Sequence, residues 1–175
     1  MDRDIEIVQD VWVETEESTP NHWVGSCRGV VIVVLHDGAH ADPRHIQAAA
    51  RRILRLSRSP VRPIRLLIVW PPSTSKPPSS EVRRAIAEDA SACVRHIDRA
   101  AGVVLGASFL QALHRSTITG ILTVTRSTAN ARMFASLVEG LRHLVEGDDR
   151  LVEALRRFCE ARLSEGSAPG EVGAR

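Results

Sequence analysis

Val30-Val31-Ile32-Val33-Val34-Leu35 is the stretch that decides the fold, because it is an unbroken run of aliphatic residues. Such a run is typical of a strand that lies inside a sheet and is covered on both faces. Asp42 and Pro43 then predict the start of a helix, because the carboxylate can accept a hydrogen bond from a free backbone N–H and proline lacks the N–H that the first turn leaves unpaired. Apolar residues recur on one face of that helix: Ile46, Ala49, Ala50, Ile53 and Leu54.

The strand-then-helix pattern repeats toward the C-terminus. Residues 64–70 and 100–105 are apolar and predict two more strands, and residues 132–134 predict a short last one. Further helices are predicted to begin at Ser79 or Ser80, after Gly106 to Ser108, at Leu137, and at Asp148 or Asp149. This alternation implies a largely parallel sheet whose crossovers are right-handed.

The N-terminal segment predicts an antiparallel start. Residues 5–14 alternate between apolar and polar with a break at Gln9, and residues 16–21 have turn composition, so we expect a hairpin with residues 30–35. The predicted fold class is α/β, a mixed sheet of about five strands, antiparallel and then parallel, with about four to five helices. Residues 1–163 are predicted to form a single domain, and residues 164–175 a disordered tail.

Composition limits the class of protein. The chain has 175 residues, of which 43% are hydrophobic and 25% are charged, as in an ordinary globular domain. Its apolar runs are far shorter than the ~20 residues that a membrane-spanning helix needs, and its start does not have the pattern of a secretory signal. Cys27, Cys93 and Cys159 lie far apart, so neither a disulfide framework nor a structural zinc site is predicted. We expect a cytoplasmic protein without a cofactor.

The element order over residues 5–145 resembles the STAS superfamily, which comprises the anti-sigma-factor antagonists and their relatives. The segment from Gly102 to Phe134, a small-residue turn followed by a mixed apolar helix and a short strand, is similar to divergent STAS-like proteins of GC-rich bacteria. The resemblance implies a regulatory module that binds other proteins. It rests on element order and not on a catalytic motif, and fold alone does not determine function.

The resemblance also implies one candidate regulatory position. In well-known members a serine at the start of the second helix is phosphorylated by a partner kinase, and this chain has Pro78-Ser79-Ser80-Glu81 there, without the family's flanking acid and glycine. Glu81 places a negative charge where a phosphate would arrive. Ser79 or Ser80 is therefore interpreted as a helix cap, with phosphorylation as the alternative.

A basic helix offers a second candidate site. No acidic residue occurs between Pro43 and Ser80, and the predicted helix carries Arg51, Arg52, Arg55 and Arg58, which we expect to be largely exposed. A basic helix face can attract nucleic acid or an anionic membrane. The acidic residues of the N-terminal segment can offset this charge if they lie close in space.

Three histidines, His36, His40 and His45, occur in one connection and are weak candidates for metal ligands. Their spacing fits no metal-binding signature, because Asp42 is explained as a cap and Asp37-Gly38 as a turn, so no metal site is predicted. The sequence also lacks a recognisable hydrolase, phosphate-loop or paired-carboxylate motif, so we do not expect an enzyme.

The predicted third helix is apolar on more than one face. Its candidate interface residues are Phe109, Leu110, Ile118, Ile121 and Leu122. The sequence thus favours a non-catalytic regulatory or scaffolding module that contacts a protein partner or forms a homodimer. The alternative is a binder of nucleic acid or anionic membrane through the arginine-rich helix, and a metal-dependent enzyme is a third, less favoured possibility.

Overall fold

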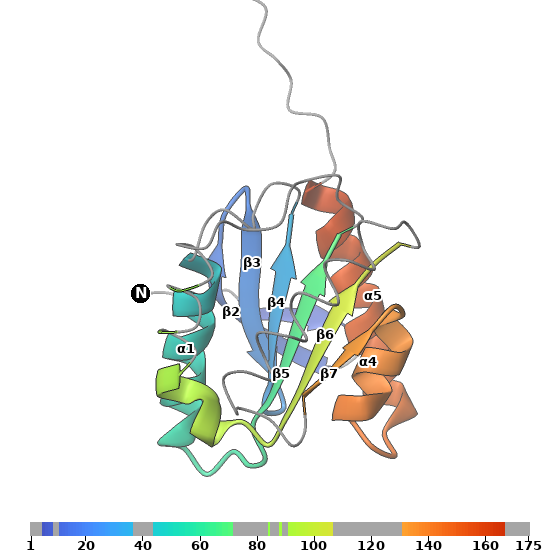
Figure 1. Cartoon of the computed structure of the whole chain (residues 1–175). Helices are drawn as coiled ribbons and strands as arrows, with labels where there is room; N and C mark the ends of the chain where they lie inside the picture. Colours follow the sequence, from blue (N-terminus) through green and yellow to red (C-terminus); the bar gives the residue numbers. More distant parts are fainter. Residues whose placement is uncertain are drawn as a thin grey trace, which may run out of the picture.

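A computed structural model of the chain describes residues 5–8, 11–36, 44–71, 84, 88, 91–106 and 131–166. These residues form an α/β structure in which one mixed sheet is covered by helices on both faces (Figure 1). The strands are β1 (Ile5–Val8), β2 (Val11–Ser18), β3 (His22–Cys27), β4 (Val30–Leu35), β5 (Arg65–Trp70), β6 (Arg99–Val104) and β7 (Ala131–Phe134). The helices are α1 (Arg44–Ser57), the 3₁₀ helix η2 (Val94–His96), α4 (Leu137–Leu144) and α5 (Asp149–Gly166).

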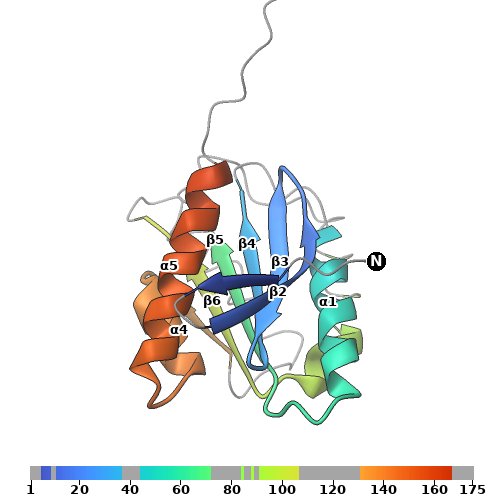
Figure 2. The same ribbon diagram turned by 180° about the vertical axis from the view of Figure 1, so that it is seen from behind.

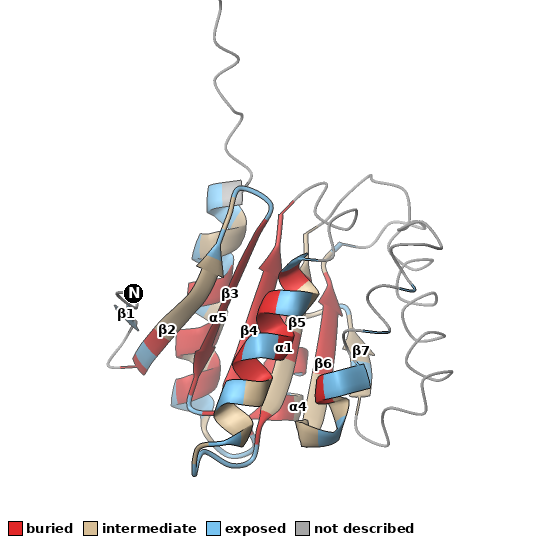
Figure 3. Cartoon of the chain, turned by 90° about the vertical axis from the view of Figure 1, so that its left-hand side faces the viewer, coloured by how far each residue is buried: buried red, intermediate tan, exposed pale blue. Residues whose placement is uncertain are grey.

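The strands lie in the sheet in the same order as in the chain. β1 to β4 are antiparallel neighbours, and β4 to β7 are parallel neighbours. Each parallel strand from β5 onward is therefore added on the same side of the strand before it. Right-handed crossovers between strands added in one direction lie on one face of a sheet. α1, which connects β4 to β5, packs on that face, whereas α4 and α5 follow the last strand and cover the opposite face (Figures 1 and 3).

β4 is the centre of both hydrophobic cores, as its sequence predicts. Ile32 and Val34 belong to the core under α4 and α5, and Val31, Val33 and Leu35 belong to the core under α1. None of these side chains is exposed to solvent. The expected interior strand, the fold class and the antiparallel-then-parallel order are therefore confirmed.

The N-terminal part of the sheet has more strands than the sequence pattern suggested, so the sheet has seven strands and not about five. The segment predicted as one strand forms two antiparallel strands, β1 and β2, in which Val8 pairs with Val11. The unpredicted β3 lies between β2 and β4, so the expected hairpin of residues 5–14 with residues 30–35 is wrong. Apolar alternation does not predict β3, because the polar and small residues His22, Gly25 and Ser26 interrupt it. Its turn to β4 has positive φ at Arg28 and Gly29, the geometry that favours tight hairpins.

α5 is longer than expected. The disordered tail was predicted to begin at residue 164, but α5 continues to Gly166, and the Ser164 hydroxyl donates a hydrogen bond to the Glu160 carbonyl. The start of α5 agrees with the sequence, because Asp148 Oδ1 accepts a hydrogen bond from the Leu151 backbone N–H. Residues 167–175 lie outside the described residues.

Gly140 allows α4 to lie close to the sheet. A Cβ atom at this position would be 2.5 Å from Val103 Cγ2 on β6. We expect Gly140→Ala to lower the free energy of unfolding by about 1–2 kcal/mol, because the overpacking exceeds the gain of up to ~1 kcal/mol in helix propensity. Urea unfolding of Gly140→Ala, Val103→Ala and the double variant measures this effect. If the clash is the cause, Gly140→Ala costs less in the Val103→Ala background, and an unchanged cost contradicts it.

Candidate interaction surface

The β1–β2 hairpin has one buried face and one exposed apolar face. Val11 and Val13 on β2 are buried against the core under α5. Trp12 alternates with them and is paired in register with Ile7, so these two side chains share the outer face with Ile5. Trp12, Ile7 and Ile5 are 62%, 58% and 51% exposed. We call these three residues the hairpin patch.

The hairpin crosses the face of the sheet opposite α1, beside α5 (Figure 2). Arg162 of α5 holds it there, because its guanidinium pairs with Glu6 of β1 and lies over the rings of Trp23 and Phe158. The position of the hairpin patch therefore depends on the core under α4 and α5. Among the described residues, the only other large hydrophobic side chain that is exposed is Val61, which lies in the connection after α1.

The arginines of α1 are paired with the acidic side chains of β2. Arg51 Nη2 lies 2.6 Å from Glu17 Oε2, and Arg55 Nη1 lies 2.9 Å from Glu16 Oε2. The acidic N-terminal segment thus offsets the charge of the basic helix. The sequence predicted this only if the two segments lie close together, and in the structure they do. Arg58 is exposed and has no ion-pair partner within the described ranges.

Arg52 corrects the prediction that all four arginines are largely exposed. Its side chain is only 5% exposed, Nη2 lies 2.6 Å from Glu14 Oε2, and Nε donates a 2.8 Å hydrogen bond to Ser26 Oγ. The helical period explains this burial, because Arg52 lies three residues after Ala49 and four after Ala48, on the face that packs on the sheet. The two alanines are short enough to leave room for the guanidinium. This spacing was the available signal in the sequence.

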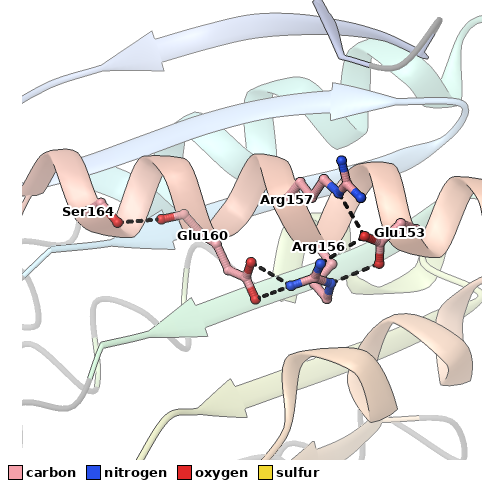
Figure 4. Close-up of polar contacts among 5 residues, drawn as sticks. All are labelled: Glu153, Arg156, Arg157, Glu160 and Ser164. Carbon is pink, nitrogen blue, oxygen red and sulfur yellow. Dashed lines mark hydrogen bonds and ion pairs between the residues drawn. The ribbon is translucent and has the colours of Figure 1, made fainter.

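The outer surface of α5 also neutralises its own charge (Figure 4). Arg156 donates hydrogen bonds to Glu153 and to Glu160, and Arg157 donates to Glu153. The hydrogen bonds from Arg156 and then from Arg157 lower the pKa of Glu153 to about 2. This face of α5 is a solvated ladder of paired charges.

The buried histidines His22, His36 and His45 make contacts that stabilise the fold. His36 and His45 are buried, and His36 Nδ1 lies 2.9 Å from the Pro20 carbonyl, to which it must donate. His22, which the sequence analysis did not single out, is fully buried between Thr19 Oγ1 and Glu17 Oε1, and its ring centroid is 5.9 Å from that of His45. In the described part of the chain no three His, Cys, Asp or Glu side chains are grouped to hold a metal ion. His40 lies outside it.

Two predicted sites also fall outside the described residues. They are the candidate cap or phosphorylation position, Ser79 and Ser80, and the candidate interface of the third helix, Phe109, Leu110, Ile118, Ile121 and Leu122. Both stay predictions. The sequence pattern does not predict the hairpin patch, because one half-buried strand over residues 5–14 would place Ile5 and Ile7 on the buried face with Val11 and Val13, whereas the β1–β2 pairing places them on the exposed face with Trp12.

Comparison of the chain with protein families, with curated proteins and with solved structures finds no match. None of the helices in the described ranges has the length and hydropathy needed to cross a membrane.

We expect Arg52→Ala to lower the free energy of unfolding by about 2–3 kcal/mol, because it leaves Ser26 and the partly buried Glu14 without their charged partner. The matched control is Arg51→Ala, which removes a half-exposed arginine from the same helix and costs at most about 1 kcal/mol. Urea unfolding of both variants checks the difference. Equal losses would contradict a structural role that is specific to Arg52.

The thiols of Cys27 and Cys159 are expected to be unreactive in the folded protein. Burial raises the pKa of Cys27 to about 11 and that of Cys159 to about 12, so almost no nucleophilic thiolate is present at pH 8. A thiol reagent should react with them only on unfolding. Because the unfolded thiols ionise near pH 9 and the folded ones do not, the free energy of unfolding should fall as pH rises from about 9 toward 11. Fast labelling of these two residues in folded protein would contradict this.

Proposed function

We propose that this protein is a non-catalytic regulatory or scaffolding module that works through protein–protein contacts, and that the hairpin patch is its contact surface. The observation that carries the proposal is the exposure of Trp12, Ile7 and Ile5 on one face of the β1–β2 hairpin. Clustered apolar side chains on a protein surface are typical of interaction sites. Tryptophan is also among the residues that contribute most to binding energy in interfaces.

The surroundings of the patch support a protein partner over a polyanion. Arg51, Arg52 and Arg55 are already paired with carboxylates of β2, and Arg156 and Arg157 with carboxylates of α5. A polyanion would have to compete with these carboxylates for each arginine. Binding of nucleic acid or of an anionic membrane is therefore the less favoured function.

We further propose that the module is STAS-like and acts in the cytoplasm. The antiparallel start, the parallel strands in chain order and the helices after β7 support the family resemblance in element order. The three cysteines, all free and buried, suit a reducing compartment. A cap remains the favoured role of Ser79 or Ser80.

The proposal is tested by capture of partners from a lysate of the native cells. The bait is the full chain or the Ile7→Ser/Trp12→Ser variant, and the matched control is Val61→Ser, which alters an exposed apolar residue outside the hairpin. We expect the hairpin variant to retain less than about a tenth of the specifically captured protein, because each lost apolar contact weakens binding by roughly tenfold. The control should retain all of it.

The same experiment distinguishes the alternative function. Apolar docking is little affected by salt, whereas binding to phosphates weakens steeply between about 50 and 200 mM salt. Equal capture by the hairpin variant and the wild-type chain would exclude the hairpin patch as the contact surface. Retention on heparin that salt and Arg58→Ala both abolish would favour the polyanion alternative.

A further inference from the structure

We propose that the hairpin patch binds the hairpin patch of a second copy of this chain, so that the two outer faces pack against each other about a two-fold axis. This inference rests on the proposed function and names the occupant of that same surface. A two-fold axis brings the same residues of both copies together, and dimers of this symmetry are the commonest closed assembly of soluble proteins.

The exposed area is sufficient for a small, specific dimer. Three large apolar side chains that are each more than half exposed leave on the order of 300 Å² of apolar surface in each copy. Two copies would bury about 600 Å² of apolar surface, which is the usual apolar share of an interface of about 1,000 Å² in total. This is the lower limit for a specific interface, so the dimer should dissociate on dilution.

The shape of the patch suits another sheet face. Ile5 and Ile7 stand in one row on β1, and Trp12 stands in the neighbouring row on β2, opposite Ile7. Two sheet faces pack about 10 Å apart with interdigitated side chains. A two-fold axis that runs across the strands at the Ile7–Trp12 pair brings the two Ile7 side chains together and the two Trp12 side chains together.

The charges beside the patch do not oppose the association of identical copies. Glu14 shares the outer face, because it pairs in register with Ile5, and a dimer would bring two such carboxylates near each other. Arg52 neutralises Glu14 within each copy at 2.6 Å, and Arg162 neutralises Glu6 on the other face of the hairpin. Within the described residues, the hairpin therefore adds no unpaired carboxylate to the contact.

The other described surfaces are less suited to this contact. Burying the outer face of α5 would desolvate Glu153, Arg156, Arg157 and Glu160, whose ion pairs are largely solvated. The outer face of α1 would likewise desolvate Arg51 and Arg55. Association through the apolar hairpin avoids this cost.

Sedimentation velocity of the purified full chain between about 1 and about 200 µM tests the proposal. We expect the mass to rise from 19.2 kDa toward twice that value with concentration. Ile7→Ser/Trp12→Ser should stay monomeric throughout, and Val61→Ser should behave as the wild type. A wild-type chain that is monomeric at every concentration, or a dimer that the hairpin substitutions leave unchanged, would overturn the proposal.

Cysteine cross-linking keeps the test valid if the serine variants unfold. The native cysteines are buried, so a single Ile7→Cys substitution supplies the accessible thiol. Under mild oxidation Ile7→Cys should form a covalent dimer in most of the protein, whereas the matched Val61→Cys should cross-link at least about tenfold more slowly, because its thiols meet only by collision. Equal rates would overturn the proposal.

Failure of this inference can be told apart from failure of the proposed function. If the wild type is monomeric but loses a captured protein on hairpin substitution, the second copy is excluded and the proposed contact surface stands. If the chain forms the hairpin dimer but its lysate partners are captured equally by the hairpin variant, the dimer stands and the partner surface lies elsewhere.

Discussion

The structure depends on one constraint, which is that β4 is apolar on both faces and has to be covered twice. The strand order equals the chain order, and the right-handed crossover from β4 to β5 places α1 on one face. The opposite face must be closed by elements from the two ends of the chain. α4 and α5 follow the last strand and cover the parallel part of the sheet, and the β1–β2 hairpin closes what remains, fixed to α5 through Glu6 and Arg162.

The polar contacts follow the same division. On the α1 face the helix packs through small residues, Ala48 and Ala49, and the space they leave admits the Arg52 guanidinium to Glu14 and Ser26. An uncompensated buried charge would be costly, so the acid on β2 and the base on α1 require each other. The sequence is acidic at the N-terminus and basic in the next segment, and these opposite charges therefore largely pair with each other within the chain.

Periodicity predicted the strands and helices that are buried through apolar side chains alone. β4 is a continuous aliphatic run, β5 contains the aliphatic run Leu66 to Val69, and α4 and α5 have clear apolar stripes, so their burial could be inferred without tertiary knowledge. β3 could not, because the burial of its polar and small residues depends on specific contacts that apolar periodicity does not show: His22 with Glu17, Gly25 with Trp23, and Ser26 with Arg52. The burial of Arg52 likewise depends on its contacts with Glu14 and Ser26, which its charge alone does not indicate. The hairpin patch could not be predicted without knowing that β1 and β2 run antiparallel.

The two faces of the hairpin are subject to different physical requirements. Its inner face has to be apolar, because Val11 and Val13 complete the core beneath α5. No such requirement applies to its outer face, where polar residues would serve a terminal hairpin equally well and would resist unwanted association. Trp12 and Ile7 oppose each other there and remain more than half in water. Because their exposure contributes little to the stability of the single chain, a contact made after folding is the physical role that their chemistry supports.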